Sequence, residues 1–544
     1  MKYLSILFLF LCHNSIAQKF KKADKIIISS LQSHIAFLAD DKLEGRRTGS
    51  EGEKKAADYI MAAFTKTGLT PKGDNETFLQ QFEVNDGRAV SASSHCIING
   101  HDLQLNKDFF PLTCCPSQSL EATCALAMQE GGSPWFYDIK DLLDENKNNP
   151  HFDLEDAIKT KALQVKQKGC TGLFIYNSST IKDELQFEGK RKTDPAAIPV
   201  VYISNAAREK YLKDETETLD IKLKIALEDK KRYGHNVAGF INNGAASTVV
   251  IGAHYDHLGW GEDHNSLHAG DPAIHNGADD NASGTAALIE LSKMLKASKL
   301  KNSNYLFIAF SGEELGLFGS KFFVEHPTVD LSTVNYMINM DMVGRLNDST
   351  HALTVGGYGT SPSWGQTLTA KDKFITVKFD SSGSGPSDHT SFYRKDIPVL
   401  FFFTGLHTDY HKPSDDADRI NYTGELMVLK YIYKAIELNN GKGKPVFTKT
   451  REMQTGTSTR FKVTLGIMPD YSFTGDGVRA DGVSAGKIAE KAGMKAGDII
   501  VQIGDHSFAD MQGYMEALSK FKKGDAAKVK VKRGADELIF DVVF

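Results

Sequence analysis

The chain has no excess of positive charge, few cysteines, and no apolar run long enough to cross a membrane. Its 64 lysines and arginines are outnumbered by 69 aspartates and glutamates, which gives a formal net charge of −5. Proteins that bind nucleic acid normally carry a strongly basic face, so no nucleic acid is expected as a partner. A transmembrane helix needs about 20 consecutive apolar residues, and the sequence predicts no transmembrane segment.

Cysteine is confined to the first third of the chain. Five cysteines follow residue 17, namely Cys96, Cys114, Cys115, Cys124 and Cys170. Their spacing matches no zinc ribbon, and their odd number leaves at least one free thiol. In an oxidising compartment we expect one disulfide among them, although the sequence does not indicate which pair forms it.

The first 17 residues have the pattern of an export signal. Lys2 supplies a positive charge, Leu4–Cys12 forms an apolar core, and Ser15-Ile16-Ala17 is a small-x-small cleavage site. A short buried helix and a membrane anchor are the alternatives, but the apolar run is too short to span a bilayer. We therefore predict a signal peptide over residues 1–17, with the mature protein in the periplasm or outside the cell.

At 544 residues the chain is too long for a single hydrophobic core, so a few domains are expected. The alternation of strand-like and helical patterns predicts one α/β domain formed by residues 18–90 and 229–445. Short strands and turns over residues 91–228 indicate a β-rich insert, which ends at a charged hinge, Glu228–Arg232. A polar linker is expected over residues 446–459 and a small β-rich domain over residues 460–544.

Ligand-type side chains follow the apolar, strand-like runs of the α/β domain. These runs, with helical patterns between them, predict a mixed, mostly parallel sheet flanked by helices. Open sheets of this class bind ligands beyond the carboxyl ends of their strands, so we expect these side chains to converge in space. They are His254, Asp280, Glu313, Glu314, Asp341 and His411, and the same segments also contain Asp256 and Tyr410.

Imidazoles and carboxylates without thiolates favour zinc, with manganese or cobalt as substitutes. Two cations about 3.5–4 Å apart need a carboxylate that bridges them. Asp280 is the best candidate, because it begins a helix whose free N–H groups and dipole favour negative charge; Asp279 is the alternative N-cap. Of Glu313 and Glu314, one suits a metal ligand and the other a general base.

Other histidines near these motifs are rival ligands. They are His257, His389 and His407, and each is expected to pack against its neighbours or to face solvent instead. Asp256 lies two residues after His254, a spacing that suits a carboxylate orienting the imidazole.

These segments resemble metallopeptidase family 28 (clan MH), a family of zinc aminopeptidases that also contains glutamate carboxypeptidase. The shared motifs are His-x-Asp, Gly-Ala-Asp-Asp-Asn-Ala-Ser-Gly, Gly-Glu-Glu-x-Gly, Asn-x-Asp and Tyr-His, in the order of the family. The resemblance implies the zinc exopeptidase fold with two Zn²⁺ per chain. It places His254 and Asp341 on one zinc and Glu314 and His411 on the other, with Asp280 as the bridge.

The resemblance also implies roles for residues beside the ligands. Glu313 would be the general acid and base, and Tyr410 would help to bind the substrate or the tetrahedral oxyanion. A cis peptide is implied between Asp280 and Asn281. The loop Leu43–Gly49 is similar to the N-terminal signature of the family; its two arginines, Arg46 and Arg47, could reach the active site or lie in solvent.

Two further segments resemble known domains. The insert is similar to a protease-associated (PA) domain through Lys168–Gly172 and Ala197–Val200. The C-terminal unit resembles a PDZ domain, whose carboxylate-binding loop would be Leu465, Gly466, Ile467 and Met468. A PDZ groove binds an extended peptide by strand addition, so the C-terminus of a peptide is the expected ligand; a closed, purely structural PDZ domain is the alternative.

Together these features predict a secreted di-zinc exopeptidase that removes N-terminal residues from peptide substrates, with Glu313 as the base. A carboxypeptidase or dipeptidase would share all five ligands. A glutaminyl cyclase has the same fold but acts with one zinc. A non-catalytic binding protein is the third alternative; such relatives typically lose ligands, whereas every ligand position is filled here.

Overall fold

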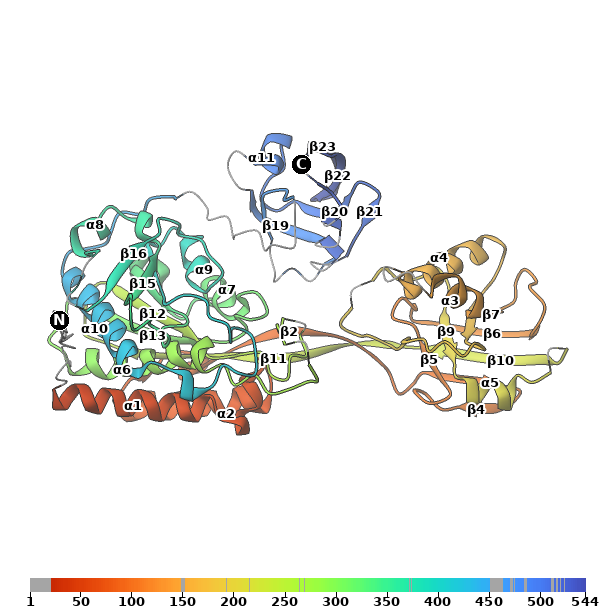
Figure 1. Cartoon of the computed structure of the whole chain (residues 1–544), viewed down its shortest axis with the longest axis horizontal. Helices are drawn as coiled ribbons and strands as arrows, with labels where there is room; N and C mark the ends of the chain where they lie inside the picture. Colours follow the sequence, from red (N-terminus) through yellow and green to blue (C-terminus); the bar gives the residue numbers. More distant parts are fainter. Residues whose placement is uncertain are drawn as a thin grey trace, which may run out of the picture. The chain divides into compact units, whose positions relative to one another are not determined.

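The computed structural model describes residues 21–147, 152–191, 193–214, 216–263, 265–268, 270–370, 372, 374–450, 463–469, 473, 475–483, 487–509, 513–514, 517–518, 520–522 and 524–544. The predicted signal peptide and residues 451–459 of the predicted linker lie outside this part of the chain. The chain divides into two compact units, whose helices and strands are labelled in Figure 1. The first comprises Met1–Gln80, His235–Glu314 and Gly319–Thr450; the second comprises Gln81–Gly234, Leu315–Phe318 and Arg451–Phe544.

A mixed sheet, parallel at its centre, organises the first unit. Its strand order is β1 (Thr70–Pro71), β11 (Leu227–Ile241), β13 (Asn304–Phe310), β12 (Thr248–His254), β14 (Val334–Met340), β17 (Val399–Phe403), β15 (Ala352–Gly356) and β16 (Thr376–Phe379), and β2 (Leu79–Val90) also pairs with β11. The four central strands β13, β12, β14 and β17 are parallel to one another. Strands β11 and β15 flank them in the antiparallel sense. The predicted mostly parallel sheet is confirmed.

Hydrophobic cores cover both faces of this sheet, as expected for parallel strands that are apolar along their whole length. Ile251, Phe307 and Ile338 belong to a core shared with α1 (Lys22–Leu38), α2 (Glu51–Thr67), α6 (Gly284–Ala297) and α10 (Tyr422–Asn439). Val250 and Leu306, one residue away along their strands, belong to the opposite core with α7 (Phe318–Glu325) and α9 (His389–Tyr393). Every residue of β12, β13 and β14 is buried, so the strand ends have fixed positions.

One predicted connection has a different structure. The charged hinge Glu228–Arg232 is part of β11, a continuous strand of 15 residues. Glu228, Asp229, Lys230 and Lys231 are exposed, so their charges stay in water and do not oppose the strand, whose backbone pairs with β2. The predicted hinge is therefore part of a strand, because exposed charged side chains are compatible with strand pairing.

Two four-stranded sheets form the insert. One contains β4 (His101–Leu103), β3 (His95–Ile98), β10 (Thr218–Ile225) and β6 (Gln118–Ala125), and the other contains β5 (Phe109–Pro111), β9 (Val200–Ile203), β8 (Leu173–Tyr176) and β7 (Trp135–Asp138). The insert also contains helices α3 (Lys140–Asn146), α4 (Leu154–Gln167) and α5 (Asn205–Tyr211), which lie between these strands in the sequence. All five cysteines are buried free thiols. The expected disulfide is therefore absent, because the cysteines serve as separate apolar packing residues.

The C-terminal part of the second unit has its own sheet and core. Its strands are β18 (Ile467–Pro469), β19 (Val478–Val483), β20 (Ile499–Ile503), β22 (Ala526–Arg533) and β23 (Asp536–Val543), with β21 (His506–Ser507) beside β20. Helix α11 (Ile488–Ala492) belongs to the same part of the chain. The sequence pattern of residues 510–520 is typical of a helix, but this stretch lies largely outside the described residues. None of the helices in the described ranges is both long and apolar enough to cross a membrane.

Candidate metal centre

Three neighbouring parallel strands deliver ligand-type residues to one edge of the sheet. His254 is the last residue of β12, Asp341 follows β14 directly, and Glu313 and Glu314 follow β13. Because β13, β12 and β14 are adjacent and parallel, their carboxyl ends lie together, where open α/β sheets bind ligands. Asp280 enters from the helical turn Ala278–Ser283 that precedes α6.

The side chains form two sets of donors that share one carboxylate. In the first, His254 Nε2 lies 3.3 Å from Asp280 Oδ1 and 3.3 Å from Asp341 Oδ1. In the second, His411 Nε2 lies 3.3 Å from Asp280 Oδ2 and 3.2 Å from Glu314 Oε2. Asp280 thus presents one oxygen to each set, and the structure brings all five predicted ligands together.

These distances suit tetrahedral zinc. Zinc–nitrogen and zinc–oxygen bonds of about 2.0–2.1 Å place the donors of a tetrahedron about 3.3–3.4 Å apart. The four donor separations, 3.2 to 3.3 Å, agree with that geometry. His254 Nε2 is also buried without a hydrogen-bond partner in the described part of the chain, as expected for a nitrogen whose partner is a cation.

The electrostatics of the site favour a cation as well. Burial raises the pKa of Glu313 well above its ordinary value, and the carboxylates of Glu314 and Asp341 raise it further against the opposing effect of His254. Burial alone would lower the pKa of His411, but Glu314 and Asp280 outweigh it and raise this pKa to about 12. Clustered carboxylates in a low-dielectric site repel one another, and divalent cations would remove that repulsion.

Hydrogen bonds fix the orientation of each donor. His254 Nδ1 lies 3.2 Å from the carbonyl oxygen of Asp256 and 3.6 Å from its carboxylate. Ser387 Oγ donates to Asp341 Oδ2 at 2.8 Å, and His411 Nδ1 lies 2.8 Å from the carbonyl oxygen of Asn265. Such partners set the tautomer and direction of metal-binding side chains.

Asp415, which the sequence analysis did not identify, ties two of the ligand-bearing loops together. Its Oδ2 accepts from the backbone N–H groups of Asp279 and Asp280 at 3.0 Å each, and its carbonyl oxygen accepts from Ala278 at 2.9 Å. Asp415 follows His411 by four residues, so it joins the His411 loop to the Asp280 turn. This short spacing from a predicted ligand is the feature of the sequence that could have pointed to Asp415.

The three rival histidines have different surroundings. His257 Nδ1 lies 2.7 Å from Glu314 Oε1, so His257 belongs to the cluster, contrary to the expectation that it would pack elsewhere. His407 Nε2 lies 3.2 Å from Asp279 Oδ2. His389 stacks on Phe401 with ring centroids 4.4 Å apart, and burial lowers its pKa to about 3.

Two expectations taken from the family resemblance concern the surroundings of Asp280 and His411. The peptide between Asp280 and Asn281 is cis, which confirms that expectation. The ring of Tyr410 stacks on that of His411 with centroids 3.9 Å apart. Burial raises the pKa of Tyr410 far above its ordinary value, with Asp280 and Glu314 adding to the rise, so its hydroxyl keeps its proton.

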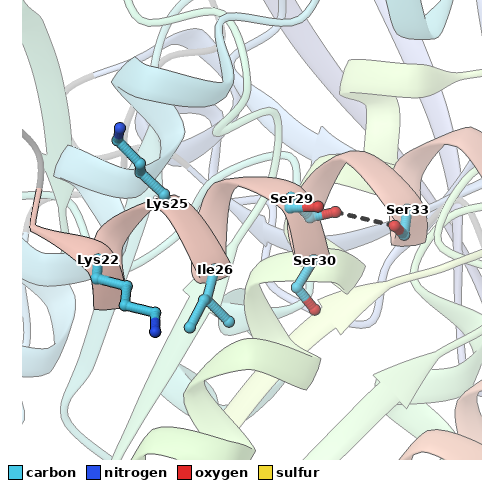
Figure 2. A pocket seen from close by; sticks show the side chains of 6 residues that line it. All are labelled: Lys22, Lys25, Ile26, Ser29, Ser30 and Ser33. Carbon is cyan, nitrogen blue, oxygen red and sulfur yellow. Dashed lines mark hydrogen bonds between the residues drawn. The ribbon is translucent and has the colours of Figure 1, made fainter.

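A pocket lies along α1 (Figure 2). Its lining residues all belong to that helix and are Lys22, Lys25, Ile26, Ser29, Ser30 and Ser33. They include no carboxylate or imidazole. Ser33 Oγ donates a hydrogen bond to the carbonyl oxygen of Ser29 at 2.9 Å. We assign no chemistry to this pocket.

The predicted carboxylate-binding loop spans the start of β18, the first strand of the C-terminal sheet. Its first two residues precede the strand and its last two belong to it. Leu465 is buried and its carbonyl accepts from Ala489 N at 2.8 Å. Gly466 has φ of 78°, a conformation that favours glycine. Ile467 and Met468 belong to β18, which pairs with β19 and stands at the end of the strand order among the described residues. An edge strand with this loop before it is the arrangement that strand addition requires.

Parts of this chain are similar to known proteins. Residues 236–436 match the model of Peptidase family M28, and residues 463–543 match that of a PDZ domain. The chain is 28% identical over 320 residues to aminopeptidase YwaD of Bacillus subtilis (strain 168), covering 56% of this chain and 64% of that protein. It is 31% identical over 149 residues to leupeptin-inactivating enzyme 1 of Streptomyces exfoliatus, covering 26% of this chain and 32% of that protein.

A solved structure, BSAP, a zinc aminopeptidase from Bacillus subtilis, aligns with a TM-score of 0.43 and 21% identity, covering 78% of this chain and 96% of that one. The M28 match spans the part of the chain that carries the donor cluster, and the PDZ match spans the C-terminal sheet. It spans 64% and 32% of the lengths of the two curated relatives.

Replacing Asp280 with alanine should abolish tight zinc binding, because the substitution removes one oxygen from each donor set. The measurement is zinc per chain, by elemental analysis after dialysis against trace zinc. Asp418→Ala is the matched control, since the side chain of Asp418 is 77% exposed, and it should keep the zinc content of the wild type. Full zinc content in the Asp280 variant would contradict the shared role of this carboxylate.

Proposed function

We propose that this protein is a zinc aminopeptidase that hydrolyses N-terminal residues from peptides. The observation that carries the proposal is the pair of donor sets joined by Asp280, with the carboxylate of Glu313 in the same site. The match of residues 236–436 to a peptidase family and the similarity to a protein named as an aminopeptidase support the reaction class.

We propose two zinc ions per chain. His254 and Asp341 would hold one, His411 and Glu314 the other, and Asp280 would contact both; the short His257–Glu314 contact makes His257 a residue that orients Glu314. When bound, the two ions supply Lewis acidity, which acidifies a water molecule and makes a peptide carbonyl more electrophilic.

Glu313 is the proposed general base and acid. A carboxylate in this place can take a proton from water and return it to a leaving group. Its carboxylate oxygen would accept a proton from the attacking water and deliver it to the nitrogen of the leaving amine. Asp256 holds the backbone of Glu313 in place, because its Oδ1 accepts from Glu313 N at 3.3 Å. The neutral hydroxyl of Tyr410 is a candidate donor to the developing oxyanion.

The remaining sequence predictions are proposals for the rest of the chain. Residues 1–17 would direct export to the periplasm or the extracellular space. The peptidase domain would comprise residues 18–90 and 229–445, and the insert over residues 91–228 would be a PA domain. The PDZ groove beside β18 would bind the C-terminus of a peptide, through the loop of Leu465, Gly466, Ile467 and Met468.

The end of the peptide that is shortened distinguishes an aminopeptidase from a carboxypeptidase. A peptide with a free amino terminus should lose residues successively from that end, while an N-acetylated peptide of the same sequence should stay intact. Mass spectrometry of timed digests measures both. Shortening of the acetylated peptide from its carboxyl end would overturn the proposal, and cyclisation of a Gln-initiated peptide would favour the glutaminyl cyclase.

Glu313→Gln should retain zinc and lose activity by about 10²–10⁴-fold, the usual contribution of a general base. The amide keeps the shape of the side chain but cannot accept the proton of the water. Hydrolysis of an aminoacyl anilide gives kcat, and elemental analysis gives the zinc content. Glu325→Gln, at an exposed residue of α7, is the control and should have wild-type kcat. An unchanged kcat in the Glu313 variant would refute this role.

A further inference from the structure

Three buried polar side chains of residues 46–53 lie outside the M28 match at residues 236–436. Arg46, Thr48 and Glu53 are each 1% exposed. Burying a charged group is costly unless its hydrogen bonds are satisfied, so their partners show what the segment does. Of the two sequence expectations for Arg46, reaching toward the active site or lying in solvent, the buried position of Arg46 contradicts the second.

Arg46 binds the backbone on both sides of the donor cluster. Its Nε donates to the carbonyl oxygen of Tyr255 at 2.7 Å, Nη1 to that of Asn276 at 2.6 Å, and Nη2 to that of Gly277 at 2.9 Å. Tyr255 directly follows His254, and Gly277 begins the turn that contains Asp280. One rigid guanidinium therefore sets the spacing of the backbone segments that carry two of the proposed ligands.

Glu53 contacts the segments that carry His254 and Glu313. Its Oε1 accepts from Tyr255 Oη at 3.2 Å and from Ser311 Oγ at 2.6 Å. Ser311 is the first residue after β13 and lies two residues before Glu313. The carboxylate also accepts from backbone N–H groups, including that of Gly49 at 3.0 Å, so its buried charge is held by several donors.

Thr48 acts on the site through Asp256. Thr48 Oγ1 donates to Asp256 Oδ2 at 2.9 Å, while Asp256 Oδ1 accepts from Glu313 N at 3.3 Å and lies 3.6 Å from His254 Nδ1. The hydroxyl fixes the rotation of the Asp256 carboxylate. It therefore influences a proposed ligand and the proposed base together.

We propose that Arg46, Thr48 and Glu53, termed the N-terminal brace, are positioning residues that hold the metal centre in its binding geometry before a cation arrives. The proposal rests on the zinc site proposed above and assigns the loop Leu43–Gly49 and the start of α2 a part in it. A purely structural segment would contribute to the stability of the fold and leave zinc affinity unchanged.

Thr48→Val tests the brace, because valine keeps the shape of threonine and removes the hydroxyl. Thr48→Ser restores the hydroxyl, and Glu51→Gln is the control on the same segment, since the Glu51 side chain is 78% exposed. Competition with a chelator gives the zinc dissociation constant, and the Tm of the metal-free protein monitors the fold. We expect Thr48→Val to weaken zinc binding about 10-fold or more, with Thr48→Ser and Glu51→Gln within about 2-fold of wild type.

The absorption spectrum of the cobalt-substituted protein is a second readout, since it reports ligand geometry independently of activity. Thr48→Val should change the cobalt spectrum, and Thr48→Ser should restore it. Wild-type zinc affinity in Thr48→Val would overturn the brace, as would equal weakening by valine and serine. If Thr48→Val does not fold, Ser311→Ala, which removes a donor to Glu53, carries the same expectation. A wild-type protein that binds no zinc would instead refute the proposed function, and the brace with it.

Discussion

The structure depends on one shared carboxylate. Asp280 places one oxygen 3.3 Å from His254 and the other 3.3 Å from His411, so two residues distant in sequence are joined through a single side chain. This contact requires the end of β12, the turn before α6 and the loop after β17 to meet at one point. The parallel centre of the sheet makes this possible, because adjacent parallel strands all end at the same edge.

The cost of this arrangement is electrostatic. Several carboxylates gather where little water reaches them, and the pKa of Glu313 rises as a result. The surrounding residues support the site with hydrogen bonds: Asp415 accepts backbone N–H groups of the Asp280 turn, and Arg46 donates to the backbone on either side of it. Cations would complete the balance of charge. The proposed N-terminal brace would keep such a site organised before a metal binds, which would favour the reaction geometry.

Much of the fold and of the candidate site can be predicted from the sequence, because local patterns such as apolar runs determine the strands and their ends. Strand β14 runs from Val334 to Met340 as its apolar run predicts, and β12 ends at His254. The ligand-type residues stand next to such runs, so their convergence follows from the rule for strand ends. The family resemblance added the division of roles between Glu313 and Glu314, which remains a prediction, as does the role of each ligand.

The features that could not be predicted from the sequence depend on contacts between residues that are far apart in the chain. Thr48 and Asp256 carry no shared local pattern, and Glu53 looks like any acidic residue in the first turn of a helix. The short contact between His257 and Glu314 was missed for the same reason. The prediction of a hinge at Glu228–Arg232 was wrong, because exposed charged residues are compatible with a strand.

Zinc-edge anomalous diffraction from crystals of the full chain tests the central claim most directly, because it locates the cations without reference to activity. We predict two peaks about 3.5–4 Å apart, one beside His254 and Asp341, the other beside His411 and Glu314, with Asp280 between them. A single peak, or zinc held elsewhere while these five side chains remain unligated, would contradict the account.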